Sequence, residues 1–308
     1  MCTNVHTDAG VGGAGAGIEI SEVDKVDTIT VRGNLPGEER QRVHRPAYAE
    51  IDACRTAKLI LCTSLDAGAG LDPCLRRGTS QSMTDPLDRP IWHALAGRQA
   101  GFAVGDGLAR RFRGDVSPFV AARDDSLEAL AAVAGLAKPG ETMLFLQRGP
   151  VPVPPGMRVV ERGLGVQMVA ETFAASAPPA GIVALGEADA GAMFDLATLT
   201  QPGPYRARTH ELSQFWGVRS DDGRLLAMAG ERLQLPGMSE VSGVCTHPDA
   251  RGRGLAGLLS RHVASQIVRR GEVPFLHAYA ANAGAIRLYE GLGFRVVSEV
   301  EGVVVALS

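Results

Sequence analysis

The segment Arg251-Gly252-Arg253-Gly254-Leu255-Ala256 combines residue types that bind phosphate. It follows a strand-like run, VSGVC, and precedes apolar residues at helical spacing. The first turn of a helix has backbone N–H groups without intrahelical partners, and these groups attract anions. Glycine lets a ligand touch the backbone, and arginine presents a fork of donors that matches phosphate oxygens. The sequence therefore predicts a phosphate or pyrophosphate site at residues 251–256.

The same turn also matches the dinucleotide-binding pattern, with glycines at positions 252, 254 and 257. That pattern requires an acidic residue after the next strand, where it binds the ribose. The next strand-like segment, 274–280, is followed by Ala281 and Asn282, and few residues remain for further strands of a nucleotide domain. A P-loop is excluded because the Gly-Lys-Ser/Thr ending is missing. A dinucleotide site stays the less favoured alternative.

Strands and helices alternate around this turn. A strand at 238–246, a helix at 254–270 and a strand at 274–280 predict a parallel pair joined by a crossover helix. One face of that helix is apolar and is expected to pack on the sheet. Its members are Leu255, Leu258, Leu259, His262, Val263 and Ile267. The other predicted elements are a strand at 166–171, a helical region at 187–199, a hairpin across 215–235, a short helix at 283–292 and a strand at 294–307.

A second motif follows, Asn282-Ala-Gly-Ala-Ile286-Arg-Leu-Tyr289-Glu-Gly-Leu-Gly293-Phe294. Together with the Arg251 turn, in this order and spacing, it resembles the GNAT N-acetyltransferase superfamily, close to the branch of glycine N-acyltransferase-like domains. The detailed resemblance covers 238–294, and the order of strands extends it loosely to 160–308. It implies a mixed, mostly antiparallel α/β sheet flanked by helices.

The resemblance also implies acetyl-CoA or a related acyl-CoA as donor, and the transfer of its acetyl group to a primary amine by direct attack. The pyrophosphate would bind the amides of 252–256, with charge from Arg251 and Arg253. The pantetheine arm would pair along a strand edge, where a backbone N–H of Val244 or Cys245 would polarise the thioester carbonyl. The residues expected to contact the coenzyme are Val244, Cys245, Thr246, Arg251, Gly252, Arg253, Gly254, Leu255, Ala256 and Asn282.

Two side chains are expected to move protons. Tyr289 matches the family tyrosine that protonates the departing thiolate. Glu240 is the candidate base, acting directly or through water, with Glu231 as the second candidate. Structural roles compete with each assignment: Tyr289 as a packed aromatic, Glu240 as a hydrogen-bonded strand carboxylate, and Asn282 as a helix cap.

The remaining candidate side chains favour structural roles. Cys245 is expected to be a small buried hydrophobe rather than a nucleophile. His247 is expected to start the turn, and His262 and His277 to be hydrogen-bonded core histidines. No metal ligand set is predicted, since neither the cysteines nor the histidines have metal-site spacing.

Upstream of the GNAT-like region, 157–308, the segment 83–156 predicts a small α/β lobe that ends in the proline-rich linker GPVPVPPG. We expect this lobe to form part of the acceptor wall, with a packing or interaction module as the alternative. The composition of 1–82 predicts a disordered or poorly packed extension. A further hypothesis is that the natural chain begins at Met83 and that 1–82 is an upstream over-read.

The bulk composition is that of a globular protein, with 45% hydrophobic and 21% charged residues and a formal net charge of −3. We therefore expect no nucleic-acid or membrane partner, and the odd number of cysteines favours the reducing cytoplasm. The expected partner is a small-molecule or peptide amine, and the sequence leaves open which amine this is. The sequence also leaves open the oligomeric state, with a homodimer as one of the options. The alternative function, which is not enzymatic, is that of a non-catalytic acyl-CoA-binding or regulatory module with the same fold.

Overall fold

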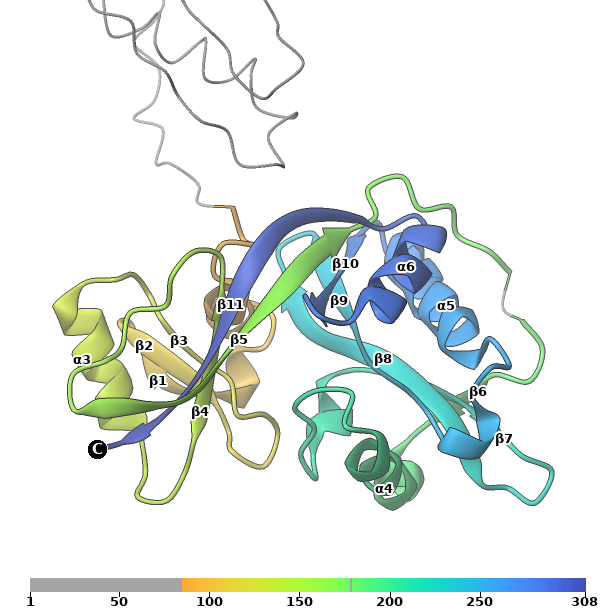
Figure 1. Ribbon diagram of the computed structural model, residues 1–308, viewed down its shortest axis with the longest axis horizontal. Helices are drawn as coiled ribbons and strands as arrows, with labels where there is room; N and C mark the ends of the chain where they lie inside the picture. The colour runs from red at the N-terminus through yellow and green to blue at the C-terminus, as the bar shows by residue number, and fades with distance from the viewer. Residues whose placement is uncertain (1–84, 178) are drawn as a thin grey trace, which may run out of the picture. The chain divides into compact units, whose positions relative to one another are not determined.

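The computed structural model of the chain describes residues 85–177 and 179–308. These residues belong to one compact unit and form two sheets, of three strands in the order β1-β2-β3 and of eight strands in the order β4-β11-β5-β10-β9-β8-β7-β6 (Figure 1). In the large sheet β10 and β9 are parallel and every other neighbouring pair is antiparallel. The predicted mixed, mostly antiparallel sheet flanked by helices is therefore confirmed.

The strands of the small sheet are Ala103–Asp106 (β1), Ala109–Phe112 (β2) and Val120–Ala122 (β3). Those of the large sheet are Met143–Gln147 (β4), Met157–Val169 (β5), Val183–Leu185 (β6), Phe215–Arg219 (β7), Leu225–Leu235 (β8), Met238–Thr246 (β9), Val273–Tyr279 (β10) and Arg295–Leu307 (β11). The α-helices are Pro90–Ala96 (α2), Leu127–Leu136 (α3), Ala190–Thr200 (α4), Leu255–Arg269 (α5) and Ala283–Gly291 (α6).

The predicted strand–helix–strand unit of 238–280 is present, as β9, α5 and β10. Helix α5 buries Leu255, Leu259, Val263 and Ile267 against β8 and β9. The alternation of side chains along β8 then places a second helix on the other face of the sheet. Ala227 and Ala229 pack in the cluster that contains α5, whereas Met228 packs with α4. Helices α5 and α4 therefore cover opposite faces of the sheet (Figure 1).

The large sheet also receives a strand from the N-terminal part of the described chain. Strand β4 pairs with β11 over five residues, from Met143↔Val305 to Gln147↔Glu301. The small sheet, α3 and β4 share a core with β11, to which Phe145 and Val303 contribute. The segment before residue 157 therefore contributes to the same sheet as the segment after it.

Strand β5 is longer than predicted. The expected strand began at residue 166, but β5 begins at Met157, because 157–165 pairs with β11 along its whole length. This first half is largely exposed, so it lacks the buried, apolar character that marks residues 166–169. The segment 101–112 of the predicted lobe contains the hairpin of β1 and β2, because Gly105 adopts φ +95° and residues 107–108 turn the chain.

Two local features of β9 shape the centre of the large sheet. Strands β9 and β10 pair only from Met238↔Val273 to Glu240↔Phe275, and beyond this point they separate. On its other side β9 has a bulge opposite β8, because the register moves from Met228↔Cys245 to Gly230↔Ser242. A bulge leaves backbone groups unpaired and bends its strand. The last residues of β9 therefore present a backbone edge inside the sheet.

The predicted extension at residues 1–82 lies outside the described residues. Among the helices of the described ranges, none combines the length and apolar character needed to cross a membrane.

Candidate active site

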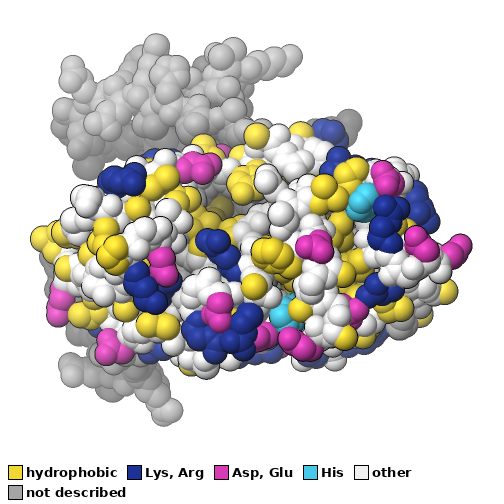
Figure 2. Space-filling model, turned by 90° about the horizontal axis from the view of Figure 1, so that it is seen from below, with side chains coloured by type: hydrophobic (Ala, Val, Ile, Leu, Met, Phe, Trp, Pro, Cys, Tyr) yellow, Lys and Arg dark blue, Asp and Glu magenta, His cyan; other side chains and the backbone are white. Residues whose placement is uncertain are grey.

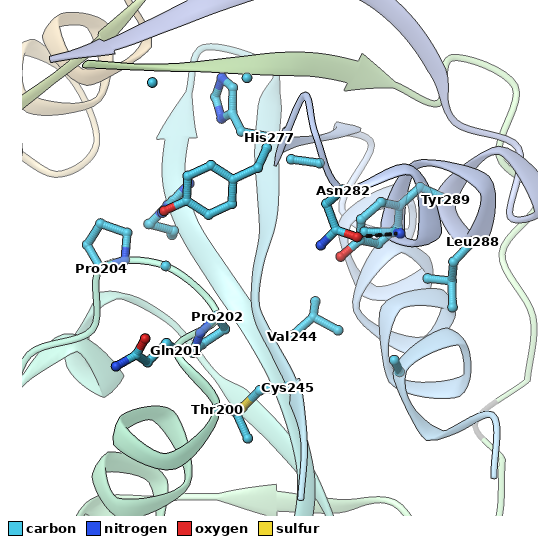
Figure 3. Close-up of a pocket in the computed structure, with 18 of the residues that line it drawn as sticks. Thr200, Gln201, Pro202, Pro204, Val244, Cys245, His277, Asn282, Leu288 and Tyr289 are labelled. Carbon is cyan, nitrogen blue, oxygen red and sulfur yellow. Dashed lines mark hydrogen bonds between the residues drawn. The ribbon is translucent and has the colours of Figure 1, made fainter. Parts of the chain in front are cut away.

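A cavity of about 670 Å³ opens where β9 and β10 separate. In Figure 3, β9 carries Val244 and Cys245, α6 carries Leu288 and Tyr289 on one side with Asn282 just before the helix, and the loop with Pro202 and Pro204 lies on the other side. The cavity is lined by the end of β9 with the turn after it, by α6, by β10, by the 200–204 loop, and by one face of β4, β5 and β11. Individual site residues were predicted only in the first two, whereas β4 belongs to the lobe that was expected to form part of the acceptor wall.

The turn before α5 has the conformation that an anion site needs. Gly252 and Gly254 adopt φ +76° and +72°, a left-handed backbone that favours glycine. An added Cβ at either position would meet no atom within 4 Å, so the backbone is open to the cavity. The N–H groups of Gly252, Arg253 and Gly254 have no acceptor among the described residues. The turn therefore has free donors beside an open cavity, which is the arrangement that the predicted phosphate site requires.

Most of the predicted coenzyme residues come together at this cavity. Those that line it are Val244, Cys245, Thr246, Arg251, Gly252, Gly254, Leu255, Ala256 and Asn282. Arg253 does not line it, although its backbone is part of the same turn. The Asn282 side chain accepts from the backbone N–H of Ala285 at 3.0 Å, so Asn282 also has the capping role that competed with coenzyme contact.

Tyr289 lies on the cavity wall and is largely buried. Burial and the nearby negative charge of Glu240 raise the pKa of its phenol to about 12, so it carries its proton at neutral pH. Its ring also packs edge-on against Phe294, with 6.1 Å between the ring centroids. The packing role and a proton-donating role are therefore compatible in this residue.

Neither predicted base lines the cavity. Glu240 has no exposed surface, and it accepts from Arg232 at 2.5 Å and 2.9 Å and from the Leu233 N–H at 3.3 Å. Burial alone would raise its pKa, but the charge of Arg232 and the hydrogen bond from His277 outweigh this effect and hold the pKa at about 2. Glu231 is paired with Arg270 at 2.6 Å and 3.0 Å. Both carboxylates are thus bound within ion pairs.

His277 connects Glu240 to the cavity, which it lines (Figure 3). Its Nδ1 lies 2.8 Å from Glu240 Oε1, and its Nε2 lies 3.0 Å from Gln167 Nε2. The amide of Gln167 is oriented by two other bonds, since Oε1 accepts from Arg148 and Nε2 donates to the Leu87 carbonyl. The amide therefore donates to His277 Nε2, and neutral His277 carries its proton on Nδ1, toward Glu240.

The other residues that the sequence singled out have structural environments. Burial raises the pKa of Cys245 to about 11, which leaves the thiol protonated and a poor nucleophile. His247 accepts from the Asp249 N–H at 3.2 Å and starts the turn as expected. His262 was expected to be fully hydrogen-bonded, but its Nδ1 is buried without a partner among the described residues. Its ring instead packs on Trp216, whose indole offers no acceptor.

Sequence reasoning named no individual residue in the far half of the cavity, although it expected the lobe at 83–156 to form part of the acceptor wall. The wall of this half includes Phe119, Leu144 and Leu146 of that lobe. It also includes Gly163 and Gly165, whose presence inside a strand was a usable signal, because strand glycines often mark the close approach of a ligand. The cluster of glycine and proline at 202–204 was a second such signal.

Away from the cavity, Glu187, His210 and Glu211 place one potential metal-ligand atom each within 4.8 Å of one another. The sequence did not predict this group. Glu187 already binds His210 at 2.8 Å, and Glu211 is bound by Arg208 through two hydrogen bonds. These pairings describe a surface network of charged side chains.

Comparisons with known proteins agree with the geometry. Residues 216–303 match the model of the family described as FR47-like protein. The chain is 46% identical to a crystal structure from Novosphingobium aromaticivorans described as an acetyltransferase from the GNAT family, with 73% of this chain and 99% of that chain covered and a TM-score of 0.69. It is 18% identical to a GCN5-related N-acetyltransferase from Kribbella flavida, with 68% and 94% covered and a TM-score of 0.47. No curated protein matches the chain.

Proposed function

Because the chain belongs to the GNAT acetyltransferase family, we propose that it transfers an acetyl group from acetyl-CoA to a primary amine. The observation that carries this proposal is the arrangement of three features around one cavity. These are the open glycine turn at 252–254, the free edge of β9 at 244–246, and the protonated phenol of Tyr289.

The free donors of the glycine turn and the N-terminus of α5 would bind the coenzyme pyrophosphate, with the guanidinium of Arg251 at the cavity wall. The exposed edge of β9 would pair with the amides of the pantetheine arm, as an added strand does at a sheet edge. These contacts bring the thioester to the bulge, where the chain turns at Gly243 with φ +63°. A backbone N–H at Val244 or Cys245 would then donate to the thioester oxygen.

The transfer itself forms a bond between the amine nitrogen and the carbonyl carbon, and it breaks the carbon–sulfur bond. Tyr289 would give its proton to the departing sulfur, since a phenol that keeps its proton at neutral pH is a competent acid there. Assignment of the base to Glu240 stays a prediction. The carboxylate reaches the cavity only through His277 and Arg232, which both line it.

The test is release of free CoA thiol from acetyl-CoA in the presence of a panel of amines, with isothermal titration of acetyl-CoA as a second measurement. Tyr289→Phe should lose turnover and keep coenzyme affinity. If acetyl-CoA binds tightly and no amine of the panel releases CoA, the chain is instead a non-catalytic acyl-CoA-binding module. If acetyl-CoA does not bind, both functions are excluded.

A further inference from the structure

We propose that the amine acceptor carries a flat, apolar body such as an aromatic ring, which lies on the sheet face formed by β4, β11 and β5. This inference rests on the proposed acyl transfer and adds the chemical class of the acceptor. The face in question is called the acceptor floor, and it consists of Leu144, Leu146, Gly163, Gly302 and Val304.

Strand register places the members of the acceptor floor side by side. Leu144 is opposite Val304, and Leu146 is opposite Gly302, which in turn is opposite Gly163 on β5. Side chains alternate between the two faces of a strand. In β4 the residues Met143 and Phe145 are buried in the core with α3, so Leu144 and Leu146 point to the other face, where the cavity lies.

The two glycines make the centre of the floor flat. Neither has a left-handed backbone, so the chain conformation does not require glycine at these positions. An added Cβ at Gly163 would meet no atom within 4 Å, and at Gly302 the nearest atom would be 3.7 Å away. Packing therefore does not require glycine either. Glycine destabilises a strand interior by about 0.5–1 kcal/mol relative to alanine, so its presence at facing positions indicates a surface left open for a ligand.

The acceptor floor is continuous with the reaction site. Gly165 is two residues from Gly163 on the same face of β5, about 7 Å along the strand. It pairs with Tyr279 of β10, and both residues line the cavity. Two residues further, Gln167 pairs with His277. An amine held near His277 and Tyr289 can thus be joined to a ring of ordinary size that rests on the floor.

The charges around the floor favour an apolar acceptor over a polycation. Among the described residues that line the cavity, Glu161 is the only acidic one; it lies opposite Val304 at the edge of the floor and is exposed to solvent. At the opposite rim Arg232 lies over the ring of Phe119 at 4.9 Å, with its charge paired to Glu240. Figure 2 shows hydrophobic side chains gathered in a hollow on this side of the molecule. A polyamine would find few carboxylates in such a site, whereas a ring gains by burial.

The first experiment measures kcat/KM for CoA release from acetyl-CoA with four amines. Benzylamine is the flat apolar probe, and cyclohexylmethylamine matches it in size but is not flat. Putrescine and glycine are the polar probes. The expected order places benzylamine about tenfold or more above cyclohexylmethylamine, and both above the polar amines. If putrescine or glycine is the best acceptor, the proposed class is wrong while acyl transfer itself is established.

The second experiment fills the floor. Gly163→Val should raise the KM for benzylamine at least tenfold and change the Kd for acetyl-CoA less than twofold. If the valine variant does not fold, the smaller change Gly302→Ala is used instead, and it should also raise the KM for benzylamine. The matched control is Arg158→Val on the same strand, because Arg158 is exposed and does not line the cavity. Unchanged benzylamine kinetics in a folded Gly163→Val or Gly302→Ala enzyme would overturn the proposal.

The two proposals fail in different ways. If acetyl-CoA binds but neither these four amines nor a broader panel accepts the acetyl group, the proposed acyl transfer fails and this inference fails with it. If amines are acetylated but the floor variants affect all of them equally, acyl transfer stands and the aromatic acceptor site does not.

Discussion

Glu240 and Tyr289 come from separate elements, β9 and α6, and the charge of the first acts on the phenol of the second. Burial of Tyr289 has the larger effect, and the buried carboxylate adds to it, so that the pKa of the phenol rises to about 12. The same carboxylate is held charged by Arg232 and His277. The buried charge of Glu240 therefore adds to the effect of burial on the pKa of a side chain that lines the cavity.

Replacement of Tyr289 by phenylalanine should lower kcat by about 10²- to 10⁴-fold, the usual contribution of a general acid. The Kd for acetyl-CoA should change little, because the ring and its packing against Phe294 remain. In the native enzyme no alkaline loss of rate should arise from Tyr289 at or below pH 10, the ordinary pKa of tyrosine. Single-turnover kinetics and titration calorimetry measure the two quantities. Equal rates for native and variant enzymes would exclude the acid role.

Glu240→Gln should destabilise the fold by about 3–5 kcal/mol, because it leaves the guanidinium of Arg232 buried without its partner. The pKa of Glu240 is lowered from 4.5 to about 2, so its contribution to stability is fully present above pH 4.5 and is lost as the pH falls toward 2. Urea unfolding at several pH values should show this loss in the native chain and a weaker one in the variant.

The same variant also tests the predicted base. A folded Glu240→Gln enzyme that keeps most of its kcat at neutral pH would show that Glu240 orients Arg232 and His277 and does not accept the proton. A large loss of kcat with unchanged Kd for acetyl-CoA would support the base assignment.

Arg251→Ala should weaken acetyl-CoA binding by about 10- to 100-fold, the range expected when a charged hydrogen bond is lost. The effect should shrink as salt concentration rises. Arg253→Ala is the matched control, because Arg253 belongs to the same turn but does not line the cavity. Its affinity should stay within about threefold of the native value. Titration calorimetry with both variants measures the two Kd values for acetyl-CoA. Equal losses of affinity would contradict the structural difference, in which Arg251 lines the cavity and Arg253 does not.

Gly243→Ala should reduce both stability and turnover. The residue adopts φ +63°, and its Cβ would lie 2.8 Å from Cε1 of Phe215, so the bulge of β9 cannot keep its shape. Gly223→Ala provides the control, since it has a comparable φ of +86° but no atom within 4 Å of the added carbon. The left-handed backbone should lower the free energy of unfolding of both variants by about 1–2 kcal/mol, and only Gly243→Ala should also lower kcat. Thermal unfolding and kinetics separate the two effects.

Most residues predicted to contact the coenzyme lie together at the cavity, and they could be grouped from the sequence because they are close along the chain. The turn at 251–256 and the helix with Asn282 and Tyr289 each consist of neighbouring residues whose types determine their conformation. The order of β9, α5 and β10 followed from the length of the crossover. The parallel pairing of β9 with β10 confirms that reasoning.

The individual residues of the proposed acceptor half could not be predicted, although the lobe at 83–156 was expected to contribute to it, because they depend on pairings between distant segments. Leu144 meets Val304 only when β4 pairs with β11, across most of the described chain. The exposed first half of β5 shows no clear apolar alternation, so its pairing partners were hidden in the sequence. The sequence left open whether Glu240 is a base or a hydrogen-bonded strand carboxylate, and its partners could not be named because Arg232 and His277 lie on two other strands.

Because β9 and β10 separate after Glu240, the last residues of β9 have an unpaired backbone edge at the centre of the sheet. The amide hydrogens of 244–246 that point away from β8 should exchange rapidly with solvent in the free protein, since the strand on that side, β10, ends its pairing at Glu240. Arrival of the coenzyme arm should slow that exchange at the same residues and leave the paired edge between β5 and β11 unchanged. The ligand then completes the secondary structure of its own binding site, so that occupancy can be read from backbone exchange before any chemistry takes place.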